Sequence, residues 1–297
     1  MMIKNRSRIC LIISAVIIVT ALVLTLCGRG INLGIDFEGG LSMEYDLKAT
    51  AEKGDVEAIL TDLGIKHFTV TYQGANDNEA IIRVKDVNQN DIQELQAKFE
   101  EKAKEKYPDA ECVGDVNYVG PVAGATLVKN AVISVLIAAA LMLVYIAIRF
   151  DFNSGVSAVF GLLHDVLIML SFMVIFRSVI QMNSSFIAAA LTIVGYSINN
   201  TIVIFDRIRE NAKKMPSAAR EEVTNISIRE SLGRTVCTTA TTLITIVALC
   251  ILGVASIREF ALPIIVGILS GVYSANMING YVWAFLEEKR MSRKAKA

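Results

Sequence analysis

The chain has few of the residues on which several classes of soluble protein depend. Its 297 residues include two histidines, one tryptophan and five cysteines. Four of these cysteines lie within or at the ends of apolar runs, where a thiol packs as a small apolar group. Cys112 is alone in the long polar segment, so no disulfide framework is predicted there. Because the sequence also lacks a zinc-binding or serine-nucleophile motif, no metal, no cofactor and no enzymatic activity are expected.

The chain also lacks a net charge, because 29 Lys and Arg residues balance 29 Asp and Glu residues. This balance hides an uneven distribution along the sequence, so the overall value says little about partners. Hydrophobic residues make up 54% of the chain, and its mean hydropathy is positive. This composition favours a membrane protein over two soluble domains.

Six apolar runs are each about as long as the ~20 residues that cross the hydrocarbon core of a bilayer. They cover residues 9–27, 131–148, 155–176, 184–205, 235–257 and 260–286. The first run is longer than the ~7–15 apolar residues of a signal peptide, and no small-x-small cleavage site precedes Arg29. We therefore predict a helical membrane protein with six spans, the first of which is retained.

The distribution of Lys and Arg predicts the orientation of these spans. The tail before the first run has three basic residues and no acidic one, residues 206–234 have seven and five, and residues 287–297 have five and two. Residues 29–126 carry ten basic and nineteen acidic residues. We therefore expect both termini in the cytoplasm and the acidic segment on the outer side.

The predicted organisation has four parts. Residues 1–28 form a cytoplasmic tail and the first span, 29–126 an outer domain, 127–286 a five-helix membrane region, and 287–297 a basic cytoplasmic tail. Within the outer domain, apolar periodicity predicts strands at 41–48, 68–73, 80–85 and 111–119 and helices at 55–63 and 88–106. The order βαββαβ is that of the ferredoxin-like α+β fold.

Polar groups within the third and fourth spans are the first candidates for function. An ionisable side chain at membrane depth costs ~2.5–3.5 kcal/mol on insertion scales and usually faces a bundle interior. His164 and Asp165 lie near the middle of the third span and form either a proton-titrating or ion-pairing site, or a structural site with a neutral Asp165. Helical spacing in the fourth span places Thr192, Gly195 and Asn199 on one stripe, beside a second polar stripe. The second stripe contains Tyr196, Ser197 and Asn200.

A further polar face opens the fifth span. Arg234 opens the span, and a series of hydroxyl residues that starts at Thr238 follows on the same face. The predicted depth of Arg234 in the membrane is that of Asn200 and Asp206. The face is either part of an ion path or gate, or a basic anchor that extends to the interface. In the sixth span, Gly267, Gly271 and Ser274 indicate close helix packing, and we assign them no chemistry.

The outer domain is flanked by pairs of residues that are candidate hinges. Gly39-Gly40 precedes its first strand, and Gly120-Pro121 separates its last strand from the second span. An alternative is that both pairs are ordinary connections.

Several motifs together resemble the SecF family of bacterial protein-translocation subunits, within the resistance-nodulation-division superfamily. The resemblance covers nearly the whole chain, and its motif in the fourth span is highly specific. The matching segments are Gly34-Ile35-Asp36-Phe37 with Gly39-Gly40, Val119-Gly120-Pro121, His164-Asp165, Gly195-Tyr196-Ser197-Ile198-Asn199, Phe205-Asp206-Arg207-Ile208-Arg209-Glu210-Asn211 and Arg234-Thr235.

The resemblance implies a role in protein export across the bacterial cytoplasmic membrane. Family members act with SecD, which supplies the other half of a twelve-span unit, and use a proton or sodium gradient to promote late stages of translocation. The implied partners are SecD, the Sec channel and its motor, the translocating unfolded polypeptide and the lipid bilayer, with no nucleic acid. The polar groups within the spans are then expected to face SecD.

One position departs from the family pattern. The motif of the fourth span usually reads Asn-Asp-Thr, whereas this chain has Asn199-Asn200-Thr201. An amide does not titrate near neutral pH. Coupling then relies on an acid in SecD, on Asp165, or on a Na⁺ site of amide and hydroxyl oxygens, unless this subunit conducts no ions.

Two other function classes are open from the sequence. A transporter half that exports a hydrophobic or lipidic small molecule is the main alternative, although its outer region should be larger. An intramembrane hydrolase using His164 and Asp165 is disfavoured, because adjacent residues project ~100° apart on a helix and are not expected to address one site.

Overall fold

The structure is a computed structural model that describes residues 3–52, 54–73, 78–85, 87–113, 116–178, 180–253 and 255–294. The chain forms two compact units. Unit 1 contains Met1–Asn32, Ile133–Ile180 and Ser185–Ala297, and unit 2 contains Leu33–Val132 and Gln181–Ser184. Each unit is described by itself.

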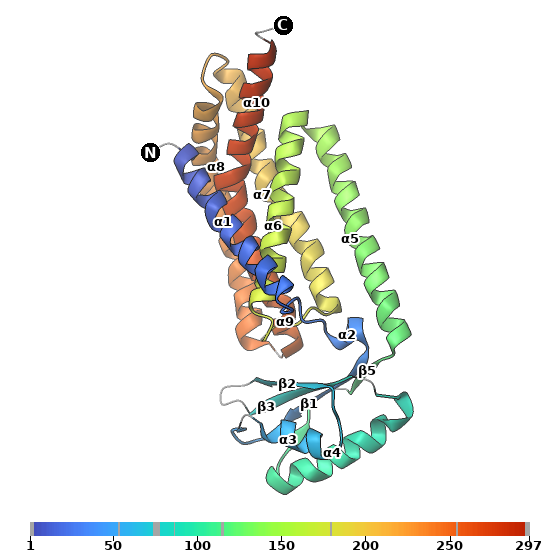
Figure 1. The fold of residues 1–297 in the computed structure, drawn as a ribbon. Coiled ribbons are helices and arrows are strands. Elements are labelled where there is room, and N and C mark those ends of the chain that lie inside the picture. The colour runs from blue at the N-terminus through green and yellow to red at the C-terminus, as the bar shows by residue number, and fades with distance from the viewer. Residues whose placement is uncertain are drawn as a thin grey trace. The chain divides into compact units, whose positions relative to one another are not determined.

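Unit 1 is a bundle of long helices. Six helical stretches in the described residues are long and apolar enough to cross a membrane, and each overlaps one predicted span, which confirms that prediction. The sixth stretch contains a π-helical turn, η2, between two α-helices. The helices, drawn in Figure 1, are α1 (Ile3–Leu26), α5 (Pro121–Arg149, shared with unit 2), α6 (Phe152–Ile175), α7 (Ser184–Lys214), α8 (Arg220–Leu252), α9 (Ala255–Ser274), η2 (Ala275–Asn279) and α10 (Gly280–Lys294).

The bundle of unit 1 has two distinguishable ends. At the terminal end, α1, α6 and α8 begin, and α5, α7 and α10 finish. Arg149 pairs there with Asp206 at 3.1 Å, and Asn153 donates a hydrogen bond to Glu287 at 2.5 Å. Asp151 caps α6 at this end by accepting a hydrogen bond from the Ser154 backbone N–H. At the opposite end, α1 and α6 finish and α7 and α9 begin.

The first span packs on the bundle through a narrow seam of small residues. Ser7, Ser14 and Ala21 are buried at a spacing of seven residues, and the intervening side chains are mostly exposed. Such spacing keeps one face of a helix on its neighbours. Most of the other side chains from Ile9 to Leu26 are apolar and exposed or half-buried, as expected of a surface that faces lipid.

Unit 2 contains an antiparallel sheet with the strand order β2-β3-β1-β4, and β5 also pairs with β1. Val56 and Leu60 of α3 and Phe99 of α4 are buried against β1, so both helices cover one face of the sheet (Figure 1). The elements are α2 (Ile35–Glu38), β1 (Gly40–Asp46), α3 (Asp55–Asp62), β2 (Phe68–Gln73), β3 (Glu79–Val84), η1 (Gln89–Asp91), α4 (Ile92–Lys106), β4 (Glu111–Cys112) and β5 (Asn117–Val119).

The single strand predicted at 111–119 is wrong in one respect. It is two strands, because the pairing register with β1 shifts by two residues between Tyr45↔Cys112 and Leu41↔Tyr118. The predicted helix at 88–106 likewise begins with the short 3₁₀ turn η1. The other predicted strands and helices match to within two residues at either end. The assignment of this sheet to the ferredoxin-like fold stays a prediction.

Candidate functional site

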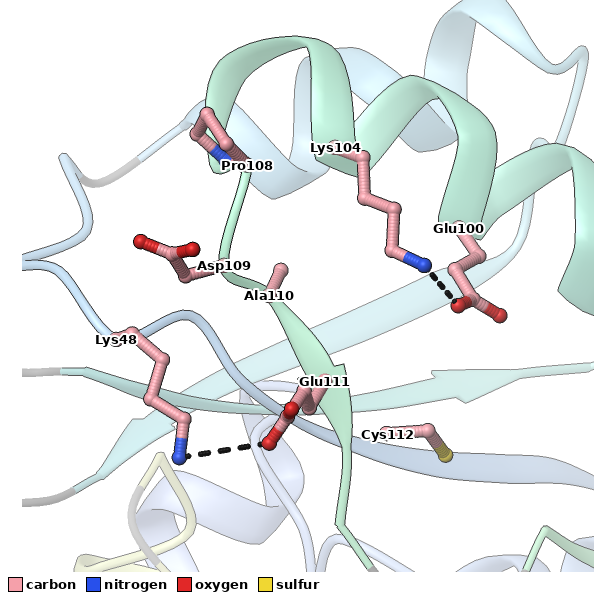
Figure 2. A pocket seen from close by; sticks show the side chains of 8 residues that line it. All are labelled: Lys48, Glu100, Lys104, Pro108, Asp109, Ala110, Glu111 and Cys112. Carbon is pink, nitrogen blue, oxygen red and sulfur yellow. Dashed lines mark hydrogen bonds and ion pairs between the residues drawn. The ribbon is translucent and has the colours of Figure 1, made fainter.

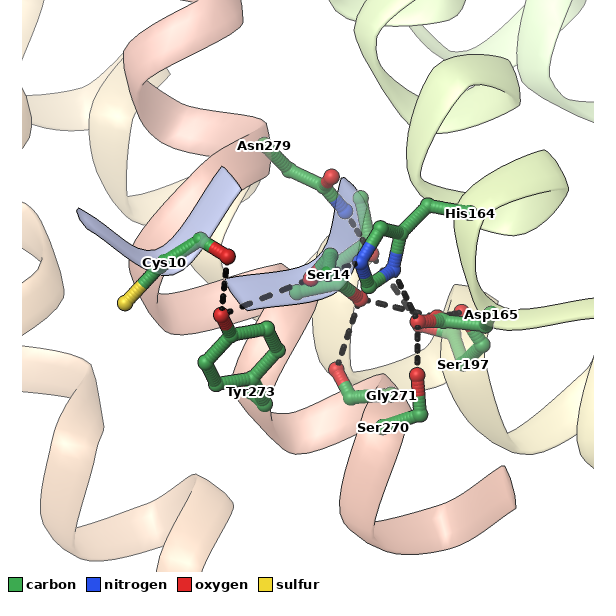
Figure 3. A network of polar contacts seen from close by, with 11 residues as sticks. Cys10, Ser14, His164, Asp165, Ser197, Ser270, Gly271, Tyr273 and Asn279 are labelled. Atoms are coloured by element: carbon green, nitrogen blue, oxygen red, sulfur yellow. Dashed lines mark hydrogen bonds and ion pairs between the residues drawn. The ribbon is translucent and has the colours of Figure 1, made fainter. Parts of the chain in front are cut away.

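The centre of unit 1 holds a buried carboxylate with four hydrogen-bond partners. Asp165 lies midway along α6 and has no exposed surface. Its Oδ2 accepts hydrogen bonds from Ser197 Oγ at 2.5 Å and Ser274 Oγ at 2.8 Å. Its Oδ1 accepts one from Ser270 Oγ at 2.7 Å and lies 2.9 Å from His164 Nδ1 (Figure 3). The four partners come from α6, α7 and α9, so the carboxylate joins three helices.

His164 extends this network to the first span. Its Nε2 lies 2.7 Å from Ser14 Oγ on α1, and its ring stacks on Tyr273 with 6.0 Å between centroids. Tyr273 in turn donates a hydrogen bond to the Cys10 carbonyl at 2.5 Å. With Asp165 ionised the carboxylate only accepts, so the Nδ1 of His164 carries a proton. These contacts join α1, α6, α7 and α9 in one polar cluster.

The expectation that His164 and Asp165 cannot address one site is therefore wrong. Although their Cα–Cβ bonds diverge, the imidazole turns back so that Nδ1 meets the carboxylate. The resulting order Ser14, His164, Asp165 follows that of a serine hydrolase triad. However, Ser14 is 3% exposed and lies mid-helix, where backbone N–H groups are used within the helix and supply no oxyanion site. The arrangement therefore does not support hydrolysis.

The candidate residues of the fourth span separate into inward and outward groups. Ser197 joins the Asp165 cluster, and Asn200 is 2% exposed with no partner for its Nδ2 among the described residues. Tyr196 is half-buried and contacts the Thr242 hydroxyl on α8. Asn199 is exposed, on the same stripe as Gly195, whose hypothetical Cβ would meet no atom within 4 Å.

The candidates of the fifth span and the end of α7 do not join the Asp165 cluster. Arg234 and Thr238 are exposed, and the Thr238 hydroxyl donates to the Arg234 carbonyl at 2.9 Å. Within the described part of the chain Arg234 forms no ion pair, and Asp206 pairs with Arg149 instead. The expectation that all the polar groups within the spans face a partner is thus corrected: Asp165, His164 and Ser197 are enclosed by the chain's own helices.

The sequence reasoning missed several members of the cluster. Ser274 donates to Asp165, although we assigned it no chemistry, and Ser270 does the same one turn earlier. Their spacing of four residues in an apolar span was the available signal. The predicted close packing is present, because a Cβ on Gly271 would lie 3.2 Å from the Ser197 Cα. Ser14 and Tyr273 carried no such signal.

The hinge candidates all lie within unit 2. Gly39 and Gly40 have φ of 81° and 134°, and a Cβ on Gly40 would lie 2.5 Å from the Val84 carbonyl oxygen. The conformation and packing at Gly40 therefore require glycine. Gly120 follows β5, and Pro121 begins α5. A hinge role for either pair stays a prediction.

The motif that contains Gly39-Gly40 also binds the connection between the third and fourth spans. Gly34 N–H donates to the Met182 carbonyl at 2.8 Å, and Asp36 accepts a hydrogen bond from the Ser184 backbone N–H, also at 2.8 Å. This contact within unit 2 was not predicted from the sequence.

Unit 2 also has a surface cavity of about 800 Å³ beside β4 (Figure 2). Its charged side chains are largely paired with one another: Lys104 contacts Glu100 at 2.6 Å, and Lys48 contacts Glu111 at 3.6 Å. The paired charges give this cavity no evident preference for an ionic ligand.

Known proteins match almost the whole chain. The family model described as "Protein export membrane protein SecD/SecF, C-terminal" matches residues 98–289, and the one described as "SecD/SecF GG Motif" matches residues 25–51. Among curated relatives, the protein translocase subunit SecF of Rhodothermus marinus is 38% identical over 95% of this chain and 92% of its own length. The protein translocase subunit SecDF of Bacillus subtilis is 36% identical over 92% of this chain and 36% of its own length.

A solved structure is also similar to this chain. The crystal structure of SecDF from Thermus thermophilus, titled a translocon-associated membrane protein, matches with a TM-score of 0.82 and 32% identity. The match covers 96% of this chain and 38% of that one. The predicted resemblance is confirmed, and this chain belongs to the SecF family of membrane-bound protein translocase subunits.

Proposed function

We propose that the chain acts with SecD as an accessory subunit of protein export, without enzymatic activity of its own. In this role it uses a proton or sodium gradient across the bacterial cytoplasmic membrane to promote late stages of polypeptide translocation. The observation that carries the gradient-linked part is the buried Asp165 cluster. Membership of the SecF family supports the export role.

The cluster is suited to convert an ionic event into helix movement. An ionisable group at membrane depth costs free energy, so its retention indicates function. Four partners from three helices bind the carboxylate, and His164 adds α1. Neutralising Asp165 weakens each of these charge-assisted bonds at once. A single ionic event therefore changes the contacts among four helices.

In this proposal Asp165 supplies the ionisable carboxylate that the family motif usually has at the position of Asn200. A proton is one candidate for the coupling ion. Sodium is the other, because one carboxylate and three serine hydroxyls supply the oxygen ligands that hard cations prefer. An acid in SecD can act together with Asp165.

The outward polar groups form the proposed contact with SecD. Asn199 and Arg234 are exposed on membrane-spanning helices, where polar side chains require partners, and the exposed Thr238 lies one turn from Arg234. Gly195 leaves space for a second helix to approach closely. In this assembly both termini are cytoplasmic, and residues 29–126 form an outer ferredoxin-like domain.

The proposal is tested by export from cells that lack their own SecD and SecF. Expression of this chain with its SecD should restore the secretion of a reporter protein, and an ionophore should remove the restored part. Asn200→Asp serves as a variant with the usual family carboxylate and should retain secretion. If expression of this chain with its SecD leaves secretion as low as in the cells that lack both subunits, but changes the retention of a lipophilic compound, the chain is instead half of a small-molecule exporter.

A further inference from the structure

The buried face of α6 changes character at Asp165. Residues spaced four apart follow one face of a helix. Toward the terminal end, this stripe consists of Gly161, Ser157 and Asn153, all of them buried. Toward the opposite end, it consists of Met169 and Met173, which are 1% and 0% exposed. The face is therefore polar or small on one side of the carboxylate and apolar on the other.

On the helix α7, the stripe that contains Ser197 is polar for one turn toward the terminal end, as far as the buried Phe205. Beyond Ser197 toward the terminal end, Thr201 accepts a hydrogen bond from Asn279 Nδ2 at 2.9 Å and donates one to the Ser197 carbonyl at 3.0 Å. In the opposite direction, Ile193 and Ala189 have no exposed surface.

The sixth span repeats this change. Ser270 and Ser274 bind the carboxylate, and η2 follows them toward the terminal end. In the opposite direction lie Ile268 and Ile264, each 2% exposed. Ile193 packs directly on this span, since a Cβ on Gly267 would lie 2.3 Å from its Cδ1.

Within unit 1, the buried polar atoms without a protein partner lie on the polar side of the carboxylate, whereas Tyr45 Oη and Gln181 Oε1 belong to unit 2. Six such atoms occur among the described residues of unit 1, and all lie toward the terminal end from Asp165. A buried polar atom costs free energy unless it is hydrogen-bonded, and internal water is its usual partner in such a place. The six atoms are Ser7 Oγ, Asn200 Nδ2, Thr239 Oγ1, Asn276 Oδ1, Asn279 Oδ1 and Trp283 Nε1.

The π-helical turn η2 contributes two of these atoms. Asn276 and Asn279 both lie on it, with carbonyl oxygens that no described residue satisfies. A π-helical turn inside an α-helix frequently marks a functional site. Asn279 also rests on the α6 stripe, because its amide occupies the space of a Cβ on Gly161.

We infer that the polar stripe is a hydrated access path that connects the Asp165 cluster to the terminal end of the bundle alone. Its lining comes from Ser157 and Gly161 of α6, Thr201 of α7 and Asn279 of η2. Toward the opposite end the path is closed by Met169, Met173 and Ile193. In the orientation proposed above, this conformation exchanges its coupling ion with the cytoplasm. That use rests on the proposed function, whereas the hydration of the path does not.

Two cysteine variants on one stripe test the inference, because Ser157 and Met173 lie eight residues from Asp165 in opposite directions. Ser157→Cys and Met173→Cys are each made in a chain whose native cysteines are replaced, and expressed with SecD. Membrane vesicles of either sidedness are treated with methanethiosulfonate ethyltrimethylammonium, whose fixed positive charge keeps it from crossing the bilayer. The thiolate is the reactive form of cysteine, and its fraction falls about tenfold for each unit by which an apolar site raises the pKa of the thiol. A cysteine at the hydrated position should therefore react at least about tenfold faster than one at the apolar position.

The expected result is modification of Ser157→Cys from the terminal side, with Met173→Cys unreactive from both. Reaction at both positions, at neither, or at Met173→Cys alone would overturn the inference. Thr201→Cys and Ile193→Cys repeat the comparison on α7, four residues on either side of Ser197, if a variant on α6 does not fold. Labelling reads water access alone, so a chain that labels as expected but does not support export contradicts the proposed function and leaves this inference standing.

Discussion

At the scale of the residue, Asp165 illustrates how a span retains a buried carboxylate. Three serine hydroxyls and one imidazole surround it, so its lone pairs are used although the side chain has no exposed surface. Hydrogen bonds to an ionised carboxylate are individually stronger than those to a neutral acceptor. Removing the acceptor is therefore expected to cost more than removing any single donor.

This expectation gives a first prediction. Ser197→Ala removes one donor to the carboxylate and should lower the stability of the chain by about 1–3 kcal/mol. Asp165→Ala leaves three hydroxyls and His164 without their acceptor and should cost about 3–5 kcal/mol. Denaturant titration of the purified chain in mixed micelles measures both. An equal loss in the two variants would contradict a network centred on Asp165.

A second prediction concerns the pH dependence of unit 2. Hydrogen bonds from Lys106 and Tyr107, each 2.6 Å long, lower the pKa of Asp55 below its ordinary value. A lowered pKa in the folded state stabilises the fold above the unfolded pKa, and this contribution is lost as the pH falls through the folded value. Asp55→Asn should therefore speed hydrogen exchange in α3 at pH 7, by an amount that corresponds to about 1–3 kcal/mol.

The same variant should differ little from the wild type at a pH below the lowered pKa of Asp55, after correction for intrinsic exchange rates. Asp62→Asn is a suitable control, because its side chain is 72% exposed. A pH-independent effect of Asp55→Asn would show that packing, and not charge, is responsible.

At the scale of the element, close helix packing depends on particular glycines. Gly161, Gly267 and Gly271 each face an atom of a neighbouring helix at a distance that excludes or strains a Cβ. Gly195 has no such neighbour. The sequence shows glycines in all these spans alike, and only the structure separates those that pack within the chain from the one that does not.

A third prediction follows from this difference. Gly161→Ala places a Cβ 2.2 Å from the Asn279 amide and should cost about 1–3 kcal/mol by overpacking. Gly195→Ala should be neutral or stabilise the isolated chain by about 0.5–1 kcal/mol, as for alanine in an open helix position. The midpoint of thermal unfolding in detergent ranks the two variants. A Gly161→Ala variant as stable as the wild type would contradict the packing of the Asn279 side chain against Gly161 of α6.

Most elements follow from apolar periodicity, which is a local property of the sequence. The six spans and the strands β1, β2 and β3 were predicted for this reason. The division of 111–119 into β4 and β5 was not, because a two-residue shift in register depends on the partner strand β1. The same limit applies to the site: Asp165 was evident as a charge in a span, but Ser14 lies 150 residues from the His164 that it contacts.

At the scale of the whole molecule, the polar groups of the spans lie in two different environments, the interior of the bundle and its exposed surface. Asp165, His164 and Ser197 are satisfied within the chain, whereas Asn199, Arg234 and Thr238 are exposed. Exposed polar groups at membrane depth are costly in lipid. The chain is therefore expected to be incomplete as a monomer in the bilayer.

A fourth prediction tests this incompleteness. Gly195→Leu fills open space on the exposed stripe of α7 and should leave the fold of the isolated chain intact. It should reduce co-purification with SecD by about tenfold, which corresponds to ~1.4 kcal/mol. Leu163→Ala, on an exposed apolar position of α6, is the matched control and should leave assembly unchanged. Normal assembly of Gly195→Leu would place the partner elsewhere.

The most direct test of the account compares gradient-dependent export by the wild type and Asp165→Asn, each expressed with SecD in cells that lack their own. Asparagine keeps the shape of the side chain but not its charge. We predict that Asp165→Asn forms the complex in normal amounts, yet loses the ionophore-sensitive part of secretion. Full gradient-dependent secretion by Asp165→Asn, at equal amounts of complex, would contradict a role of Asp165 in ion coupling and would assign that coupling to SecD.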